Sequence, residues 1–145
     1  MATVSDILAI KGTNVLSISP EATVLDAANR MNERKIGSLL VMDGSRLIGI
    51  ITERDMLQRV LVELRDPAHT PVGEVMTTEL VCCHPHTTLE EARGVLKNRR
   101  IRHLPVLDEC EQLIGLISIG DLNAHLANDH ERTIFVLQEY IYGRA

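Results

Sequence analysis

Two short apolar runs in the chain are followed by the same polar residues. Residues 47–55 read Leu-Ile-Gly-Ile-Ile-Thr-Glu-Arg-Asp, and residues 113–121 read Leu-Ile-Gly-Leu-Ile-Ser-Ile-Gly-Asp. Both runs are short and rich in β-branched residues, which predicts buried strands. Apolar residues then recur at helical spacing, as at Met56, Val60 and Leu61, which predicts a helix with the aspartate in its first turn.

A strand that turns into a helix in this way brings backbone N–H groups, a hydroxyl and a carboxylate together. The N–H groups at the helix start suit a phosphate, and the carboxylate suits the two hydroxyls of a sugar. A purely structural interpretation is also open, in which Thr52 and Ser118 cap the helices and Asp55 and Asp121 favour their positive ends. Because the pattern occurs twice, we favour the ligand-binding interpretation of both aspartates.

The two motifs belong to a longer internal repeat. Residues 15–61 align with residues 80–127 when one extra residue is allowed at Gln112, and thirteen of the 47 aligned pairs are identical. A period of about 65 residues in two copies does not fit a solenoid, whose repeats are shorter and more numerous. We therefore predict a duplicated unit that packs as a pseudo-twofold pair.

Each copy predicts the element order β-α-β-β-α. An extended piece (15–18 or 80–83) precedes a proline and a helix, for which Thr23 and Thr88 are candidate N-caps. Thr88 and Glu91 also form a capping-box pattern. Two strands follow, 39–42 or 104–107 and then the motif strand, before the last helix. The expected fold class is α/β in the broad sense (α+β), with helices outside the repeats at the termini.

These patterns set the expected boundaries along the chain. We expect an N-terminal helix and lead-in at 1–14, a first repeat at 15–64, a linker at 65–79, a second repeat at 80–128 and a C-terminal helix at 129–145. The last helix carries an apolar stripe at Ile134, Leu137 and Ile141, so it should dock on this module or on a second chain.

Composition excludes several classes of function. Aromatic residues make up 2% of the chain and the net charge is −5, which argues against nucleic acid as a partner. The basic run at 97–103 is better explained as a solvated helix end. No apolar stretch approaches the roughly 18 residues of a membrane span, and residues 1–12 lack a signal-peptide pattern. The three cysteines, in no disulfide pattern, indicate reduced thiols and a cytoplasmic protein.

Neither a metal site nor a catalytic site is predicted. Cys82, Cys83, His84 and His86 suggest zinc, but neighbouring residues on a strand point to opposite faces and cannot all reach one metal. Ser118 or Cys82 beside His103 would resemble a nucleophile and its base, yet no oxyanion motif accompanies either. We therefore expect no catalytic residues, no catalytic cofactor and no enzyme.

The chain resembles the tandem cystathionine-β-synthase (CBS) domain pair, also called a Bateman module. The resemblance is carried by the segments Val-Leu-Ser-Ile-Ser-Pro at 15–20, Ile-Gly-Ser-Leu-Leu-Val at 36–41, Val-Gly-Glu-Val-Met-Thr at 72–77, Ile-Arg-His-Leu-Pro-Val at 101–106 and the two motifs. It covers nearly the whole chain. It implies a regulatory module that binds adenine nucleotides, with AMP or NAD favoured and ATP or ADP as alternatives. It also implies a homodimer that signals to a regulated protein.

The resemblance further implies two ligand clefts. The first would use Thr52, Arg54, Asp55, Leu80, Val81, Cys82, Arg102, His103 and Pro105. The second would use Val15, Leu16, Ser17, Gly37, Ser38, Leu40, Ser118, Gly120 and Asp121. The first has the stronger cations for a phosphate, because Gly120 stands where Arg54 does. The alternative function is a protein-interaction module whose clefts no longer bind ligand, with the C-terminal helix as the partner surface.

Overall fold

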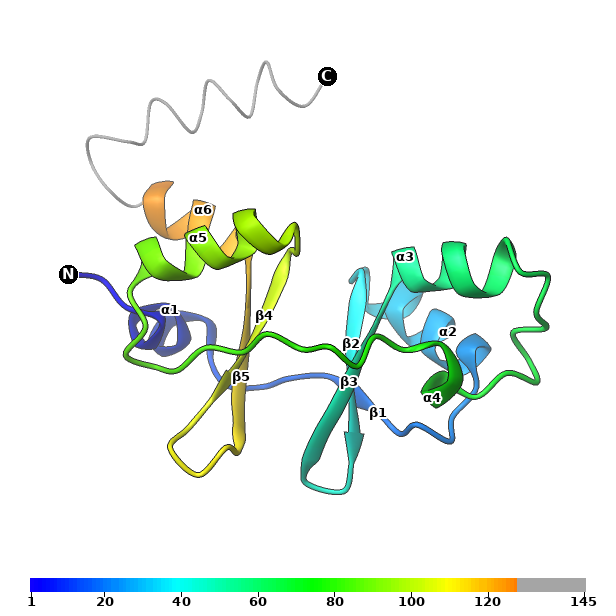
Figure 1. The fold of residues 1–145 in the computed structure, drawn as a ribbon. Helices are drawn as coiled ribbons and strands as arrows, with labels where there is room; N and C mark the ends of the chain where they lie inside the picture. The colour runs from blue at the N-terminus through cyan, green and yellow to red at the C-terminus, as the bar shows by residue number, and fades with distance from the viewer. Residues whose placement is uncertain (128–145) are drawn as a thin grey trace, which may run out of the picture. The chain divides into compact units, whose positions relative to one another are not determined.

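A computed structural model describes residues 1–127 of the chain, which divide into two compact units (Figure 1). The first-repeat unit spans Asn14–Val81. Among the described residues, the second-repeat unit combines Met1–Thr13 with residues 82–127. Both mix helices with a small sheet, which confirms the mixed α+β fold. The predicted C-terminal helix lies outside the described residues.

The first-repeat unit contains a three-stranded sheet in the order β1-β2-β3. β1 (Ser17–Ile18) runs parallel to β2 (Ser38–Asp43), and β2 pairs antiparallel with β3 (Arg46–Thr52). The β2–β3 turn places Gly44 at a φ of 63°, a left-handed conformation that glycine adopts without strain. The hairpin therefore presents the first motif at the end of β3.

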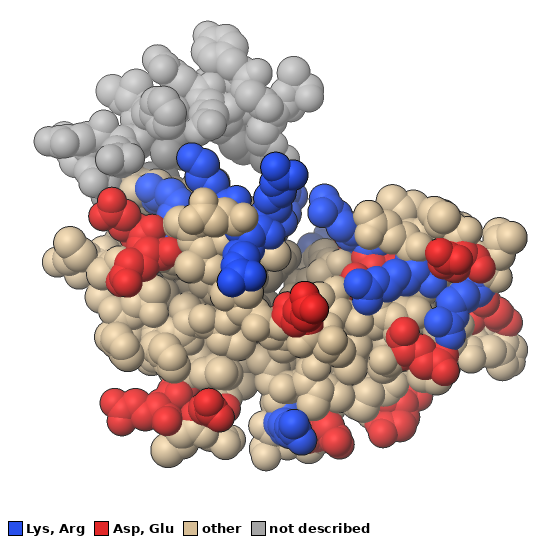
Figure 2. Space-filling model, viewed as in Figure 1, with Lys and Arg blue, Asp and Glu red and all other residues tan. Residues whose placement is uncertain are grey.

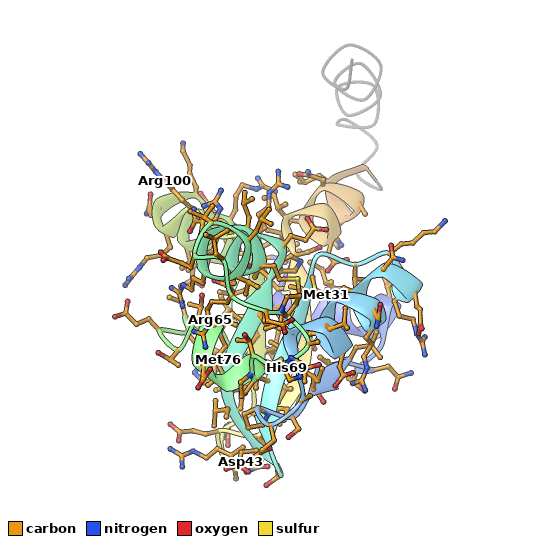
Figure 3. The ribbon with its side chains drawn as sticks, turned by 90° about the vertical axis from the view of Figure 1, so that its right-hand side faces the viewer. Met31, Asp43, Arg65, His69, Met76 and Arg100 are labelled. Atoms are coloured by element: carbon orange, nitrogen blue, oxygen red, sulfur yellow. The ribbon has the colours of Figure 1, made fainter. Side chains whose placement is uncertain are left out.

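Helix α2 (Val24–Arg34) packs on this sheet through an apolar stripe that includes Val24, Ala27 and Met31. Its N-cap Thr23 accepts a hydrogen bond from the Asp26 N–H at 3.1 Å, as expected of a threonine at this position. The unit's core comprises Ile18, Val24, Ala27, Met31, Leu39, Val41, Ile51, Val60, Val72 and Val75. Met31 and the adjoining Met76 are labelled in Figure 3.

The helix after the first motif has two parts. It begins as α3 (Glu53–Met56) and continues as the π-helical η1 (Leu57–Leu61). After a turn the chain forms the short helix α4 (Val72–Val75), within the segment that was expected to be a linker. None of the helices in the described residues is long and apolar enough to cross a membrane.

In its described residues the second-repeat unit has a similar order of elements but lacks a strand equivalent to β1. Helix α5 (Leu89–Arg99) precedes the antiparallel strands β4 (His103–Leu107) and β5 (Leu113–Ser118), and α6 (Ile119–Ala127) follows the second motif. Thr88 caps α5 and forms the predicted capping box with Glu91.

The extended piece predicted at 80–83 forms no strand, and this part of the prediction is wrong. Cys83 makes a single parallel bridge to β4, donating to the Pro105 carbonyl and accepting from the Leu107 N–H, both at 2.9 Å. The next bond of the ladder would need a backbone N–H at Pro105, which proline lacks. In the first repeat Leu40 takes that place, and its N–H donates to the Leu16 carbonyl at 3.4 Å.

Helix α1 (Val4–Lys11) belongs to the second-repeat unit, although it precedes the first repeat in the chain. The Val4 and Ser5 N–H groups donate at 2.8 Å to the carbonyls of Thr87 and Pro85. The expected boundaries treated residues 1–14 as a separate lead-in, whereas these bonds make α1 part of the folded second repeat.

The segment that contains α4 is similarly joined to the first repeat. Thr77 and Ile50 of β3 exchange two backbone hydrogen bonds of 2.8 and 3.0 Å. The motif glycines make both arrangements possible: a Cβ atom on Gly49 would lie 2.6 Å from the Met76 sulfur, and one on Gly115 would lie 2.6 Å from a Leu8 methyl group. Each unit thus consists of one repeat plus the segment that precedes the other repeat.

Candidate ligand-binding motifs

Both motifs lie where a strand passes directly into a helix, as the sequence predicts. The Asp55 N–H donates to the Thr52 hydroxyl at 3.1 Å, and the Thr52 N–H donates to the Asp55 carboxylate at 3.0 Å. Ser118 and Asp121 exchange the equivalent bonds at 3.1 and 2.8 Å. These reciprocal bonds form capping boxes. The motif residues therefore cap the helices, as the purely structural interpretation proposes. Only those side-chain atoms that take no part in capping remain available to a ligand.

The Asp55 carboxylate is almost entirely engaged within the first-repeat unit. Its Oδ2 accepts bonds from the Thr52 N–H and hydroxyl, and its Oδ1 accepts one from the Thr77 hydroxyl at 2.9 Å. The Arg59 Nε atom lies 3.9 Å from Oδ1, and Asp55 is 5% exposed. A buried carboxylate with this many donors mainly stabilises the turn.

The Asp121 carboxylate is more open. Its Oδ2 accepts the Ser118 N–H and lies 2.7 Å from the Lys11 ammonium of α1, which also donates to the Leu116 carbonyl at 2.7 Å. The side chains of Lys11 and Asp121 are 37% and 24% exposed. Within the described residues no hydrogen bond to Asp121 Oδ1 is present, so this atom can accept hydrogen bonds from a ligand.

Strand pairing places residues of different predicted clefts side by side within each unit. In the first-repeat unit, Ser38 pairs with Thr52, and the Glu53 N–H donates to the Gly37 carbonyl at 3.0 Å. In the second-repeat unit, His103 pairs with Ser118. The Ile119 N–H there donates to the Arg102 carbonyl at 3.0 Å.

His103 is close enough to the second motif for the charges there to influence its ring. Burial lowers the pKa of His103 most, Lys11 and Arg102 lower it further, and Asp121 opposes them. The imidazole is therefore neutral at pH 7, and it can both donate and accept a hydrogen bond.

The remaining predicted residues divide between the two units, and their assignment to clefts stays a prediction. The first-repeat unit carries Thr52, Arg54, Asp55, Leu80 and Val81 of the first cleft and Val15, Leu16, Ser17, Gly37, Ser38 and Leu40 of the second. The second-repeat unit carries Cys82, Arg102, His103 and Pro105 of the first cleft and Ser118, Gly120 and Asp121 of the second. Lys11 was not predicted, because nothing in the sequence shows that α1 reaches the second motif.

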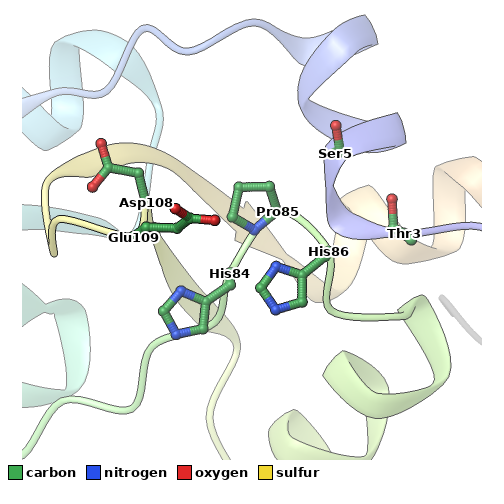
Figure 4. Close-up of a pocket in the computed structure, with 7 residues that line it drawn as sticks. All are labelled: Thr3, Ser5, His84, Pro85, His86, Asp108 and Glu109. Carbon is green, nitrogen blue, oxygen red and sulfur yellow. The ribbon is translucent and has the colours of Figure 1, made fainter.

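A cavity of about 370 Å³ in the second-repeat unit lies outside both motifs (Figure 4). It is lined by Thr3, Ser5, His84, Pro85, His86, Asp108 and Glu109. The two imidazole rings stack in parallel with their centres 5.5 Å apart, and His84 Nδ1 lies 3.1 Å from the Leu107 carbonyl oxygen. Among residues 1–127, no three His, Cys, Asp or Glu side chains are grouped to hold a metal ion.

Basic side chains gather over α5 (Figure 2). Lys97 and Arg99 occupy its last turn, whereas Glu90 and Glu91 occupy its first. This order complements the helix dipole, with acids at the positive end and bases at the negative end. The basic run thus has a local structural explanation and does not by itself indicate nucleic-acid binding.

Two α+β units with a similar element order and the same strand-to-helix motif define a tandem-repeat module. The family model for the CBS domain matches residues 4–62 and 72–128. The chain therefore belongs to the CBS domain family, as a tandem pair of these domains.

Relatives support this assignment over most of the chain. The CBS domain-containing protein YhcV of Bacillus subtilis is 38% identical over 76% of this chain and 77% of its own. The mitochondrial CBS domain-containing protein CBSX3 of Arabidopsis thaliana is 35% identical over 97% of this chain and 72% of its own. A solved structure of a candidate signal-transduction protein with CBS domains from Burkholderia ambifaria is 38% identical, with a TM-score of 0.83 over 89% of this chain and 97% of its own.

Proposed function

We propose that this protein is a non-catalytic sensor that binds an adenine nucleotide through its motifs and signals occupancy to a partner protein. The observation that carries this proposal is the geometry of Asp121. Its Oδ2 is fixed by the Ser118 N–H and Lys11, whereas no residue among 1–127 bonds to Oδ1, which can therefore serve a ligand. A carboxylate held in this way can accept both hydroxyls of a ribose without losing its cap to the helix.

The two motifs are unequal as ribose acceptors. Asp55 has bonds to both oxygens and is 5% exposed, so a ribose there would have to share or displace the Thr77 hydroxyl. Asp121 has fewer partners and is more exposed. We infer that the second motif holds the ribose more readily, whereas the first offers the stronger motif cation, Arg54. AMP or NAD is the favoured ligand, with ADP and ATP as alternatives.

Calorimetric titration with AMP, ATP and NAD tests the proposal, with 2′-deoxy-AMP as the probe of the ribose. Asp121→Asn should weaken AMP binding by at least tenfold, because a bond to a charged acceptor contributes about 1.5–3 kcal/mol. The native protein should lose a comparable factor with 2′-deoxy-AMP, and the two losses should not add, because they remove one contact.

Asp43→Asn is the matched control, since Asp43 is an exposed hairpin residue. It should leave AMP binding unchanged. The absence of heat with every nucleotide at millimolar concentration would refute the proposal, and so would additive losses in the cycle.

A second candidate, interaction with another protein chain without ligand, is favoured by an exposed apolar surface on the first-repeat unit. Leu57, Leu61, Val62 and Leu64 are 53%, 67%, 66% and 91% exposed. Large exposed apolar side chains grouped in one short segment are typical of interfaces. We propose that a second copy of this chain covers it in a homodimer, in a cytoplasmic setting that keeps the cysteines reduced.

Light scattering distinguishes the oligomeric states. A homodimer should have twice the 16.1 kDa mass of the chain, and Leu61→Lys should shift it toward the monomer. A native protein that remains at 16.1 kDa at all concentrations would rule out the homodimer without affecting the nucleotide proposal.

A further inference from the structure

The second motif lacks a cation of its own. Gly120 stands in the sequence position that Arg54 has in the first motif, directly before the aspartate. The Asp121 carboxylate would therefore repel the phosphate of any nucleotide whose ribose it held. A site for a phosphorylated ribose needs a positive charge from elsewhere in the unit.

Helix α1 brings that charge to the motif. Lys11, its last residue, places its ammonium 2.7 Å from Asp121 Oδ2. Within the part of the chain that the structure describes, two of its three N–H bonds point to Asp121 and the Leu116 carbonyl, which leaves one for a ligand. We propose that Lys11 is the phosphate-binding cation of the second motif, supplied by α1 in place of the arginine that the repeat lacks.

The position of Lys11 follows from the length and the anchoring of α1. The corresponding helix of the first-repeat unit, α4, has four residues, and its segment offers the motif only the neutral Thr77 hydroxyl. Helix α1 has eight residues, and Leu8 packs directly over Gly115. The additional turn carries the lysine beyond this contact to the carboxylate.

The surrounding charges suit an anion once Lys11 is present. Lys11 neutralises Asp121, and the nearby Arg102 adds a further positive charge. The carboxylate then serves the neutral ribose and the ammonium serves the phosphate. This role rests on the nucleotide-binding function proposed above and specifies its second site.

The test compares AMP with adenosine, which lacks the phosphate, in an Arg54→Gly background that removes the cation of the first motif. Lys11→Gln should weaken AMP binding at least tenfold, the factor expected for a lost charge-assisted bond, and should change adenosine binding less than twofold. Lys11→Arg should retain AMP binding. Lys97→Gln, at an exposed lysine in the last turn of α5, is the matched control and should have no effect.

A rescue variant separates loss of charge from loss of structure. A Cβ atom on Gly120 would lie 3.5 Å from the Ser118 hydroxyl, an ordinary contact, so a side chain can begin there without a clash at its Cβ atom. Gly120→Arg should restore AMP binding to the Lys11→Gln protein.

Three results would overturn the role of Lys11. They are equal losses of AMP and adenosine, tighter binding of both ligands, and no rescue by Gly120→Arg. If the native protein binds none of AMP, ATP, NAD and adenosine, the proposed function itself is refuted, which distinguishes that failure from failure of the inference.

Discussion

Replacing Gly49 with alanine should destabilise the first-repeat unit, because the space over this glycine is already filled. A Cβ atom there would lie 2.6 Å from the Met76 sulfur and 3.0 Å from the Thr77 carbonyl oxygen. The Met76 side chain can rotate away. The Thr77 carbonyl cannot, because it belongs to a two-bond backbone bridge with Ile50. The substitution must therefore displace the backbone.

The expected magnitude follows from two opposing effects. Overpacking a filled site costs about 1–3 kcal/mol. Alanine recovers about 0.5–1 kcal/mol of the backbone entropy that glycine loses on folding. Because part of the obstacle is backbone, the overpacking cost should not lie at the low end of its range. We therefore expect a net loss of about 1–2 kcal/mol in the free energy of unfolding.

Urea denaturation of four variants measures this effect. Gly94→Ala is the control, because a Cβ atom at this helical position meets nothing within 4 Å, and it should stabilise the protein by about 0.5–1 kcal/mol. In a Met76→Ala background the penalty of Gly49→Ala should shrink, because only the Thr77 carbonyl remains in the way. A neutral Gly49→Ala protein, or a penalty that vanishes in the Met76→Ala background, would refute the argument that the Thr77 backbone is the obstacle.

Three further predictions concern individual side chains. Because the pKa of His103 is lowered in the folded protein, the unfolded chain binds a proton more readily than the folded chain does. The free energy of unfolding should therefore fall as the pH drops below about 6.5, and it should fall less in the His103→Gln variant. A raised pKa of His103 in an NMR titration would contradict this. Burial raises the pKa of Cys83 to about 12, so a thiol reagent at pH 8 should label the exposed Cys110 first, and faster labelling of Cys83 would be inconsistent with its environment. Thr77→Val should cost about 1–3 kcal/mol, because it removes the donor to one oxygen of the buried Asp55; an unchanged urea midpoint would show that the bond contributes nothing.

Local patterns in the sequence were sufficient to predict most elements of each repeat. Thr88 and Glu91 form the capping box that their spacing indicates, and the motif strands β3 and β5 end at the hydroxyl residues. These features depend on residues within a few positions of one another, so periodicity and capping rules apply directly. The missing strand before α5 depends on Pro105, which lies more than twenty residues later in the sequence.

The exchange of segments could not be predicted, because it depends on long-range packing. Two glycines in equivalent motif positions indicate a close approach, but they do not say what approaches. The structure identifies Met76 over Gly49 and Leu8 over Gly115. For the same reason the sequence gives no sign that Lys11 contacts Asp121, 110 residues further along the chain.

This exchange of segments links the two repeats through their motif aspartates. Each motif aspartate is bonded by a side chain from the segment that precedes the other repeat, Thr77 for Asp55 and Lys11 for Asp121. A repeat that packed only with the segment directly preceding it in the chain would lack one of the donors to its motif carboxylate. A ligand that competes for either carboxylate must change the bond between that carboxylate and the segment. A ligand shifts a conformational equilibrium only when it binds the two conformations with different affinity, and such a changed bond would provide that difference. The segments containing α1 and α4 are therefore the parts of the protein whose contacts a ligand bound at the motifs would change first.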